Sequence, residues 1–260
     1  MLSLYRLFSL FLIGFMSRLR IYLIVSLIGS LLMIGNSCIS QTTFNGWFGA
    51  FSTFKFDKKF SVNVDVQARS TDQLEHLNTF IFRPGLNWHF RKNMIATVGY
   101  GYFHIRRMNS GISGYAPEHR IWQQLIINHN AGFIPIQHRF RLEQRFIGKT
   151  TVENGDLKVS GNSFANRIRY FNRAIIPFNG SKPFIHGIFG ALQNEVFLNI
   201  GDKSAVNGKF FDQNRVYLAI GYRLSAKFDL EAGYMNQYVS GSNDNLSRAH
   251  ILQLATYLRL

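Results

Sequence analysis

Cysteine is almost absent from this 260-residue chain. Its single cysteine, Cys38, lies before Thr42. From Thr42 onward the chain can therefore form no disulfide bond, which excludes the small disulfide-stapled folds of secreted proteins. Two readings of Cys38 stay open. It is either removed with a leader peptide or modified with lipid, although Gly35-Asn36-Ser37 in front of it lacks the leucine that usually begins a lipidation motif.

A hydrophobic run long enough to cross a membrane as a helix is also absent. Two apolar runs, Leu2–Phe15 and Ile21–Ile34, flank the basic patch Arg18-Leu19-Arg20. The second run has 14 residues, whereas a membrane-spanning helix needs roughly 20. A short apolar run behind basic residues is typical of a signal peptide.

We therefore predict a signal peptide over residues 1–40 and a folded region over residues 41–260. Translation starts at Met1 or at Met16, which would give a conventional basic start to the signal. The small side chains at Cys38 and Ser40 predict cleavage after Ser40. Residues 1–40 hold three arginines and no acid, so cleavage lowers the net charge from +15 to +12.

Motifs for catalysis are missing. Outer-membrane lipid hydrolases and acyl transferases often place a His-x-Ser pair on one strand, yet none of the eight histidines here is followed two residues later by serine. In Glu118-His119 an acid and a histidine are adjacent, but neighbours on a strand point to opposite faces. We expect no enzyme and no catalytic residue. A triad assembled across strands stays open, because geometry and not sequence order defines triads.

Signals for cofactors and nucleic acid are missing as well. The sequence has no metal-ligand spacing, no glycine-rich phosphate loop and no nucleic-acid-binding motif. We therefore expect no metal, no cofactor and no nucleic-acid partner. Acids are scarce, with 14 Asp and Glu against 29 Lys and Arg. The basic excess is explained below by arginines inside a barrel and lysines in its turns.

What the chain does have is alternation with a period of two. In Phe60–Arg69, Phe, Val and Ala alternate with Ser, Asn, Asp, Gln and Arg, and in Ile136–Phe146 apolar residues alternate with arginines and a glutamate. This period indicates β-strands with one apolar and one polar face. Eleven segments are predicted as strands: 44–56, 60–70, 77–90, 94–105, 118–129, 136–147, 164–176, 183–198, 210–224, 228–239 and 248–260.

The lengths of strands and connections predict a membrane barrel. Most segments have 11–14 residues, which suits a tilted membrane-crossing strand. Short turns alternate with longer loops rich in Gly, Ser and Asn, a difference typical of outer-membrane barrels with periplasmic turns. The fold class is therefore all-β, a transmembrane antiparallel up-and-down β-barrel. The longer loops are predicted at 106–117, 148–163, 199–209 and 240–247, with a shorter one at 71–76.

The strand number predicted in this way is odd. Single-chain bacterial barrels have even counts, so we expect ten or twelve strands. Either 42–56, the segment with the weakest alternation, is not a full barrel strand, or a twelfth strand is missing from the eleven segments.

Charged residues sort by type along the chain. All ten lysines lie outside the predicted strands except Lys55 at a strand end, whereas arginines and acids fall on the predicted inward faces. Arginine suits a narrow lumen because its planar fork makes several hydrogen bonds at once. Twelve inward arginines, Arg259 among them, against six acids, including Asp65 and Asp229, leave an excess of six positive charges. The candidate site is this lumen network, also a possible anion path: Arg69, Arg83, Glu118, Arg120, Arg139, Arg141, Glu143, Arg145, Arg167, Arg169, Arg173, Glu195, Arg215, Arg223 and Glu231.

The last strand predicts partners. Apart from Thr256, apolar residues occupy every second position from Leu252 to the terminal Leu260, like the C-terminal signal by which barrels are recognised for insertion. Partners expected on this basis are outer-membrane lipid and the barrel-assembly machinery, which would bind the C-terminal strand. The expected location is the outer membrane of a Gram-negative bacterium.

Three stretches carry a resemblance to a known family: Glu118–Gln124, His138–Phe146 and Gln213–Tyr222. There, and over most of 44–260, the chain resembles an uncharacterised domain-of-unknown-function family of outer-membrane β-barrels from Bacteroidota. The resemblance implies location and architecture. It brings no catalytic residue and no known ligand.

Three functions remain in view. The first is a non-enzymatic barrel whose arginines and acids pair as a structural network, with a protein partner docking at the extracellular loops. The second is a narrow, porin-like channel that prefers small anions, because the excess positive charge would focus a positive field. The third is a lipid-modifying enzyme of the outer membrane.

Overall fold

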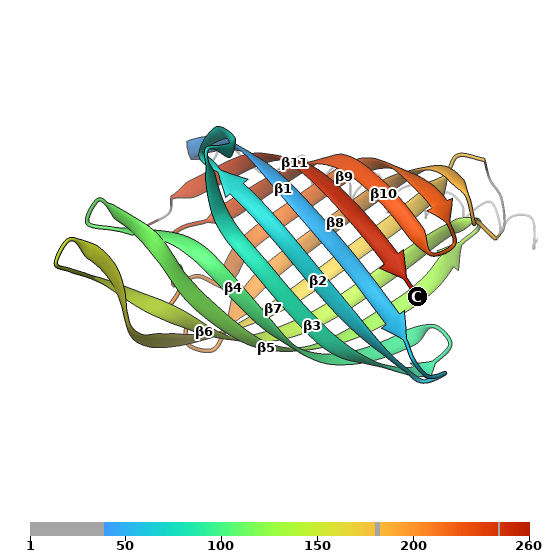
Figure 1. Cartoon of the computed structure of the whole chain (residues 1–260), viewed down its shortest axis with the longest axis horizontal. Helices are drawn as coiled ribbons and strands as arrows, with labels where there is room; N and C mark the ends of the chain where they lie inside the picture. The colour runs from blue at the N-terminus through green and yellow to red at the C-terminus, as the bar shows by residue number, and fades with distance from the viewer. Residues whose placement is uncertain (1–38, 180–182, 244) are drawn as a thin grey trace, which may run out of the picture. The chain divides into compact units, whose positions relative to one another are not determined.

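The chain folds into a closed barrel of eleven strands (Figure 1). The computed structural model describes residues 39–179, 183–243 and 245–260. The strands are β1 (Ile39–Lys55), β2 (Phe60–Thr71), β3 (His76–Arg91), β4 (Met94–Asn109), β5 (Ile112–Ala131), β6 (Ile134–Glu153), β7 (Asp156–Pro177), β8 (Gly187–Ile200), β9 (Phe211–Ser225), β10 (Phe228–Ser240) and β11 (Leu246–Arg259), with a 3-10 turn, η1 (Asp72–Leu74), between β2 and β3.

The barrel closes through a parallel pair. Consecutive strands are antiparallel neighbours, but β1 pairs with β11 in parallel, from Ile39↔Leu246 to Thr53↔Arg259. β1 also pairs with β2 over Trp47–Lys55, so it is a full barrel strand. The expectation of ten or twelve strands was therefore wrong. All eleven predicted segments are strands, and an odd count is accommodated because the first and last strands run in the same direction.

One rim of the barrel carries the short connections and the other carries long hairpins. The predicted loops 106–117 and 148–163 are not loops, because β4–β5 and β6–β7 continue as paired strands up to tight turns. At Ser110-Gly111 and Asn154-Gly155 both central residues have positive φ, the backbone pattern of the type I′ turns that join twisted strands. Lys149 and Lys158 consequently lie within strands, against the prediction that lysines avoid them. Both hairpins project beyond the other strands (Figure 1).

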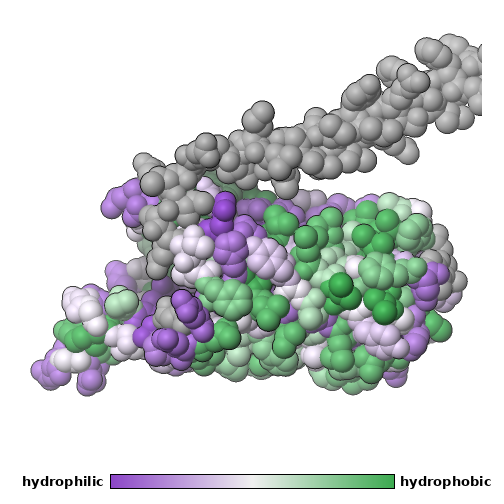
Figure 2. Space-filling view, turned by 90° about the horizontal axis from the view of Figure 1, so that it is seen from above, coloured by the Kyte–Doolittle hydropathy of each residue, from purple (hydrophilic) through white to green (hydrophobic). Residues whose placement is uncertain are grey.

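The outer wall of the barrel is apolar. Phe48, Ile220 and Leu254 each expose about half or more of their surface, and they sit on the outward faces that the period of two predicts. Figure 2 shows apolar side chains over the barrel wall and hydrophilic ones gathered at the projecting hairpin end. Among the described residues, no helix is both long and apolar enough to span a membrane.

The interior is filled by side chains over much of its length. Trp122 is fully buried, and its ring lies where a Cβ on Gly85 or Gly99 would come within 2.5 and 2.2 Å. Glycine at these two positions lets a large ring lie flat on the neighbouring strands. A buried apolar cluster of Tyr217, Met235 and Ile251 fills the wall opposite.

The signal peptide and the fate of Cys38 lie outside the described residues, which begin at Ile39. β1 starts two residues before Gln41, the first residue of the mature chain that we predict. Cleavage after Ser40 would leave the pairing of β1 with β11 from Gln41 onward and its pairing with β2 from Trp47 onward intact.

Candidate functional site

The fifteen candidate residues all occupy inward-facing positions of the barrel, and the structure divides them into three groups. Four belong to separate ion pairs, and Arg69 has no carboxylate within 4.0 Å among the described residues. The other ten form one connected network: Glu118, Arg120, Arg139, Arg141, Glu143, Arg145, Arg167, Arg169, Glu195 and Arg215.

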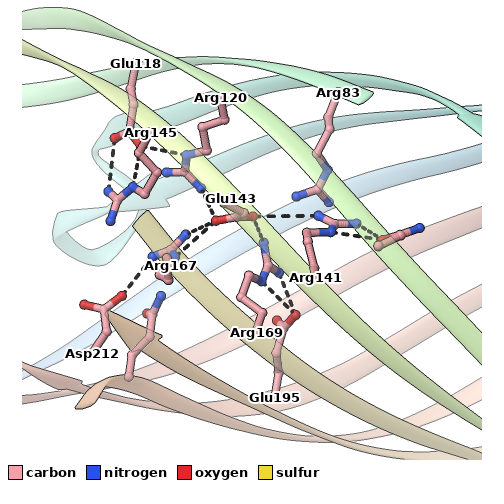
Figure 3. Close-up of polar contacts among 12 residues, drawn as sticks. Arg83, Glu118, Arg120, Arg141, Glu143, Arg145, Arg167, Arg169, Glu195 and Asp212 are labelled. Atoms are coloured by element: carbon pink, nitrogen blue, oxygen red, sulfur yellow. Dashed lines mark hydrogen bonds and ion pairs between the residues drawn. The ribbon is translucent and has the colours of Figure 1, made fainter. Parts of the chain in front are cut away.

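Glu143 on β6 is the centre of this network (Figure 3). Arg167 donates to its Oε2 from Nε and Nη2 at 3.1 and 2.7 Å, and Arg169 donates to its Oε1 at 2.6 Å. The guanidiniums of Arg120 and Arg141 lie 3.4 and 3.9 Å from the carboxylate. Glu143 is 1% exposed, so four cations and not water compensate its charge.

Two further carboxylates extend the network toward either end of the barrel. On the side of the hairpins, Glu118 accepts hydrogen bonds from Arg120 at 2.6 Å and from Arg145 at 2.7 and 3.2 Å. Toward the short turns, Glu195 accepts from Arg169 at 2.6 Å and from Arg139 at 2.9 Å. Each acid is therefore shared among several guanidiniums, which is the arrangement that arginine's fork favours.

The strand register explains why these side chains meet. In the β6–β7 pair, Arg141 lies opposite Arg169 and Glu143 lies opposite Arg167. Two arginines facing each other across a strand pair repel unless an anion lies between them. Glu143 lies two positions along from Arg141 and supplies that anion, pairing with Arg167 directly and with Arg169 diagonally.

Separate pairs tie other parts of the wall together. Arg83 forms a two-bonded pair with Asp65 across β2 and β3 at 2.6 and 2.9 Å. Arg173 on β7 bonds Glu231 on β10 and the hydroxyl of Tyr257 on β11, so this contact crosses the interior and does not join neighbouring strands. A third group holds Asp229 between two arginines, Arg223 at 2.8 and 2.9 Å and Arg259 at 2.7 Å.

Between the network and the short turns the interior encloses a cavity of about 420 Å³. Arg69 lines it, bonded to Gln67 Oε1 at 2.6 and 3.2 Å and stacked 3.9 Å from the centre of the Trp47 ring. Arg215 faces the same ring at 4.9 Å.

A family model described as a protein of unknown function (DUF2490) matches residues 44–248. The match runs from within β1 to within β11 and so includes residues of all eleven strands. The chain belongs to the DUF2490 family. A comparison with curated proteins finds no match. The predicted membership of an uncharacterised family is therefore confirmed over these residues.

Sequence reasoning missed several interior residues of this DUF2490 barrel, and four of them contact the network. Asp212 bonds Arg167 at 2.8 Å because a bulge, where β9 shifts register against β8 near Phe211, turns it inward; alternation alone could not reveal that. Arg107, 3.7 Å from Glu118, was assigned to a loop. Gln124 accepts two hydrogen bonds from Arg141, and Trp122 lies under the same guanidinium. Both residues alternate in step with Glu118 and Arg120 on β5, so the period of two alone places them on the inward face.

Most histidines of the DUF2490 barrel lie on its outer face and pair with tyrosines. His119 contacts the hydroxyl of Tyr100 at 2.5 Å, while its neighbour Glu118 is buried inside, as adjacent strand residues must be. Tyr222 contacts His186 at 2.9 Å near the opposite rim. Among the described residues, no group of three or more His, Cys, Asp or Glu is arranged to hold a metal ion.

Proposed function

We propose that this protein is a non-enzymatic outer-membrane β-barrel whose interior is closed by an arginine–carboxylate network and whose hairpins dock a protein partner. The apolar outer wall and the difference between the two rims support a membrane location. The proposal includes the outer membrane of a Gram-negative bacterium, Bacteroidota by the resemblance noted above, with the short turns in the periplasm.

The observation that carries this proposal is the burial and sharing of the network. Glu118 and Glu143 are each 1% exposed, and Arg141 and Arg167 are nearly as deeply buried. Contacts between strands that are not neighbours, such as Arg173 with Glu231, bridge the interior. Side chains that are dry and multiply bonded leave little room for a continuous aqueous path, and small barrels are often filled in this way.

The docking role rests on the two hairpins. They touch each other beyond the barrel, where Asn109 donates to the carbonyl of Thr150 at 2.8 Å. Met108, Tyr115 and Val159 are exposed there, on strands long enough to stand clear of the membrane. Such a paired, partly apolar projection on a rigid barrel is a suitable surface for another protein.

Planar-bilayer recording tests the closed lumen. Purified protein should insert without a steady current, and fractionation should find it in the outer membrane with heat-modifiable gel mobility. A soluble periplasmic protein would contradict the location, and a stable conductance would contradict the closed barrel.

A second candidate, a narrow anion-preferring channel, is favoured by the excess of positive charge inside. If a conductance appears, it should prefer anions, and replacing Arg141 and Arg169 together with Gln should reduce that preference. If the double variant prefers anions as strongly as the unchanged protein does, the anion-channel candidate is refuted. The third candidate, a lipid-modifying enzyme, is tested by phospholipid hydrolysis in mixed micelles, where we expect no activity above a buffer control.

A further inference from the structure

The cavity beside the network is strongly positive. Seven arginines and only two carboxylates, Glu195 and Asp229, line its 420 Å³. Both acids already form ion pairs. Glu195 pairs with Arg139 and Arg169, and Asp229 pairs with two other arginines. Arg83 and Arg173 pair with Asp65 and Glu231, which lie outside the lining. The positive charge that no carboxylate among the described residues neutralises is therefore that of Arg69 and, in part, that of Arg215.

Two arginines concentrate this excess at one place. Arg69 has no carboxylate within 4.0 Å among the described residues, and Arg215 reaches only Glu195, at 3.8 Å. Both guanidiniums contact the ring of Trp47, at 3.9 and 4.9 Å from its centre, so this one ring holds both cations at the cavity. In the described structure the Nε of Arg215 and the Nε of Arg139 are buried without a hydrogen-bond partner.

A buried guanidinium that lacks an anion and hydrogen-bond acceptors destabilises the folded barrel. A guanidinium removed from water costs free energy unless an anion and hydrogen-bond acceptors replace its hydration. The barrel meets this requirement for the arginines around Glu143 and leaves it unmet around Trp47. A bound anion would supply the missing charge and accept from the free N–H groups.

We propose that this cavity is a binding site for a small organic anion whose carboxylate or phosphate group is held by Arg69 and Arg215. Aromatic rings of Phe51, Phe171 and Tyr257 line the same cavity, so the rest of the ligand has an apolar surface to contact. The volume lies within the roughly 300–1,000 Å³ of small-molecule pockets, which excludes a whole phospholipid or a polymer as the enclosed group.

The ligand would enter from the rim of the short turns. His129, Asn130 and Pro135 belong to the lining and are exposed at the β5–β6 turn. Toward the hairpins, the network around Glu143 closes the interior. In the orientation proposed above, the site opens to the periplasm and is a dead-end pocket. Binding does not require conduction, so this inference can fail or succeed independently of the closed barrel.

Calorimetry on the full barrel in detergent micelles at low salt tests the site. The probes are inorganic phosphate, citrate and phenyl phosphate, with phenol as the neutral comparison. Phenyl phosphate should bind saturably and more tightly than inorganic phosphate, and phenol should not bind. Comparing the affinity for citrate with the affinity for inorganic phosphate distinguishes a carboxylate site from a phosphate site. Each substitution removes charge-assisted hydrogen bonds to the anion, so Arg69→Gln and Arg215→Gln should each weaken binding about tenfold or more.

Arg91→Gln is the matched control, because Arg91 is exposed at the end of β3 and does not line the cavity. It removes the same charge and should leave affinity unchanged. Heat-modifiable mobility of each variant verifies that the barrel is folded. The proposal is overturned if no probe binds saturably, or if Arg91→Gln weakens binding as much as Arg69→Gln and Arg215→Gln do.

Discussion

Replacing Glu143 with Gln should destabilise the barrel more than any other single neutralisation of an acid in the network. The substitution keeps the shape of the side chain and removes the one charge shared by four guanidiniums. At 1% exposure, water cannot enter to take its place. Removing one partner of a buried ion pair typically costs about 3–5 kcal/mol, because the other charge stays buried and uncompensated.

The other carboxylates that these four arginines contact determine where in that range the loss of stability should fall. Arg120, Arg167 and Arg169 keep other carboxylates, Glu118, Asp212 and Glu195 respectively. Arg141 keeps only the neutral Gln124. One guanidinium out of four thus loses its only carboxylate, which places the cost near the lower end, at about 3 kcal/mol.

Urea unfolding of the barrel in lipid vesicles, followed by tryptophan fluorescence, measures this cost. Glu153→Gln, at the exposed tip of the β6–β7 hairpin, is the control and should shift stability by less than about 0.5 kcal/mol. Adding Arg141→Gln to Glu143→Gln should cost less than Arg141→Gln alone, with a coupling above about 1 kcal/mol. If Glu143→Gln and Glu153→Gln prove equally mild, the network does not stabilise the barrel and the reasoning fails.

Other substitutions test the faces and the turns. Leu142→Arg places a charge on the apolar outer wall and should cost about 2–4 kcal/mol in vesicles, whereas Ser160→Arg on the exposed hairpin should be near neutral in the same unfolding assay. Gly99→Ala would bring a methyl group within 2.2 Å of the Trp122 ring; we expect a loss of about 1–3 kcal/mol and a shifted emission spectrum. Gly155→Val forces a branched side chain onto a φ of +82°, which costs about 1–2 kcal/mol and should make the hairpin sensitive to protease while the barrel stays folded.

Whether a strand residue faces the lumen or the outside was predictable from the sequence, because a period of two assigns alternate residues to opposite faces of the barrel wall. Arg83, Glu118 and Arg169 are inside for that reason alone. Which acid binds which arginine was not predictable, since it depends on the register between strands, and Asp212 reaches Arg167 only through a bulge.

Two errors have physical explanations. The hairpins at 106–117 and 148–163 were predicted as loops because Gly, Ser and Asn dominate their composition, although Asn154-Gly155 is a strong signal for a two-residue hairpin turn. The strand count was rejected as odd because bacterial barrels are usually even, whereas β1 forms hydrogen-bonded pairs on both of its edges.

The parallel pairing of β1 with β11 has a consequence for how the chain can be handled. Both strands run toward the short turns, and Leu260 bonds Thr53 and Lys55 at that rim. The described chain therefore starts at one mouth of the barrel and finishes at the other (Figure 1). In the membrane location that we propose, reporter groups fused to the two ends of the described chain would lie on opposite sides of the membrane, so one pair of fusions reads out orientation. Circular permutants, which are simple when both ends share a mouth, would here need a linker that threads the wall or the lumen.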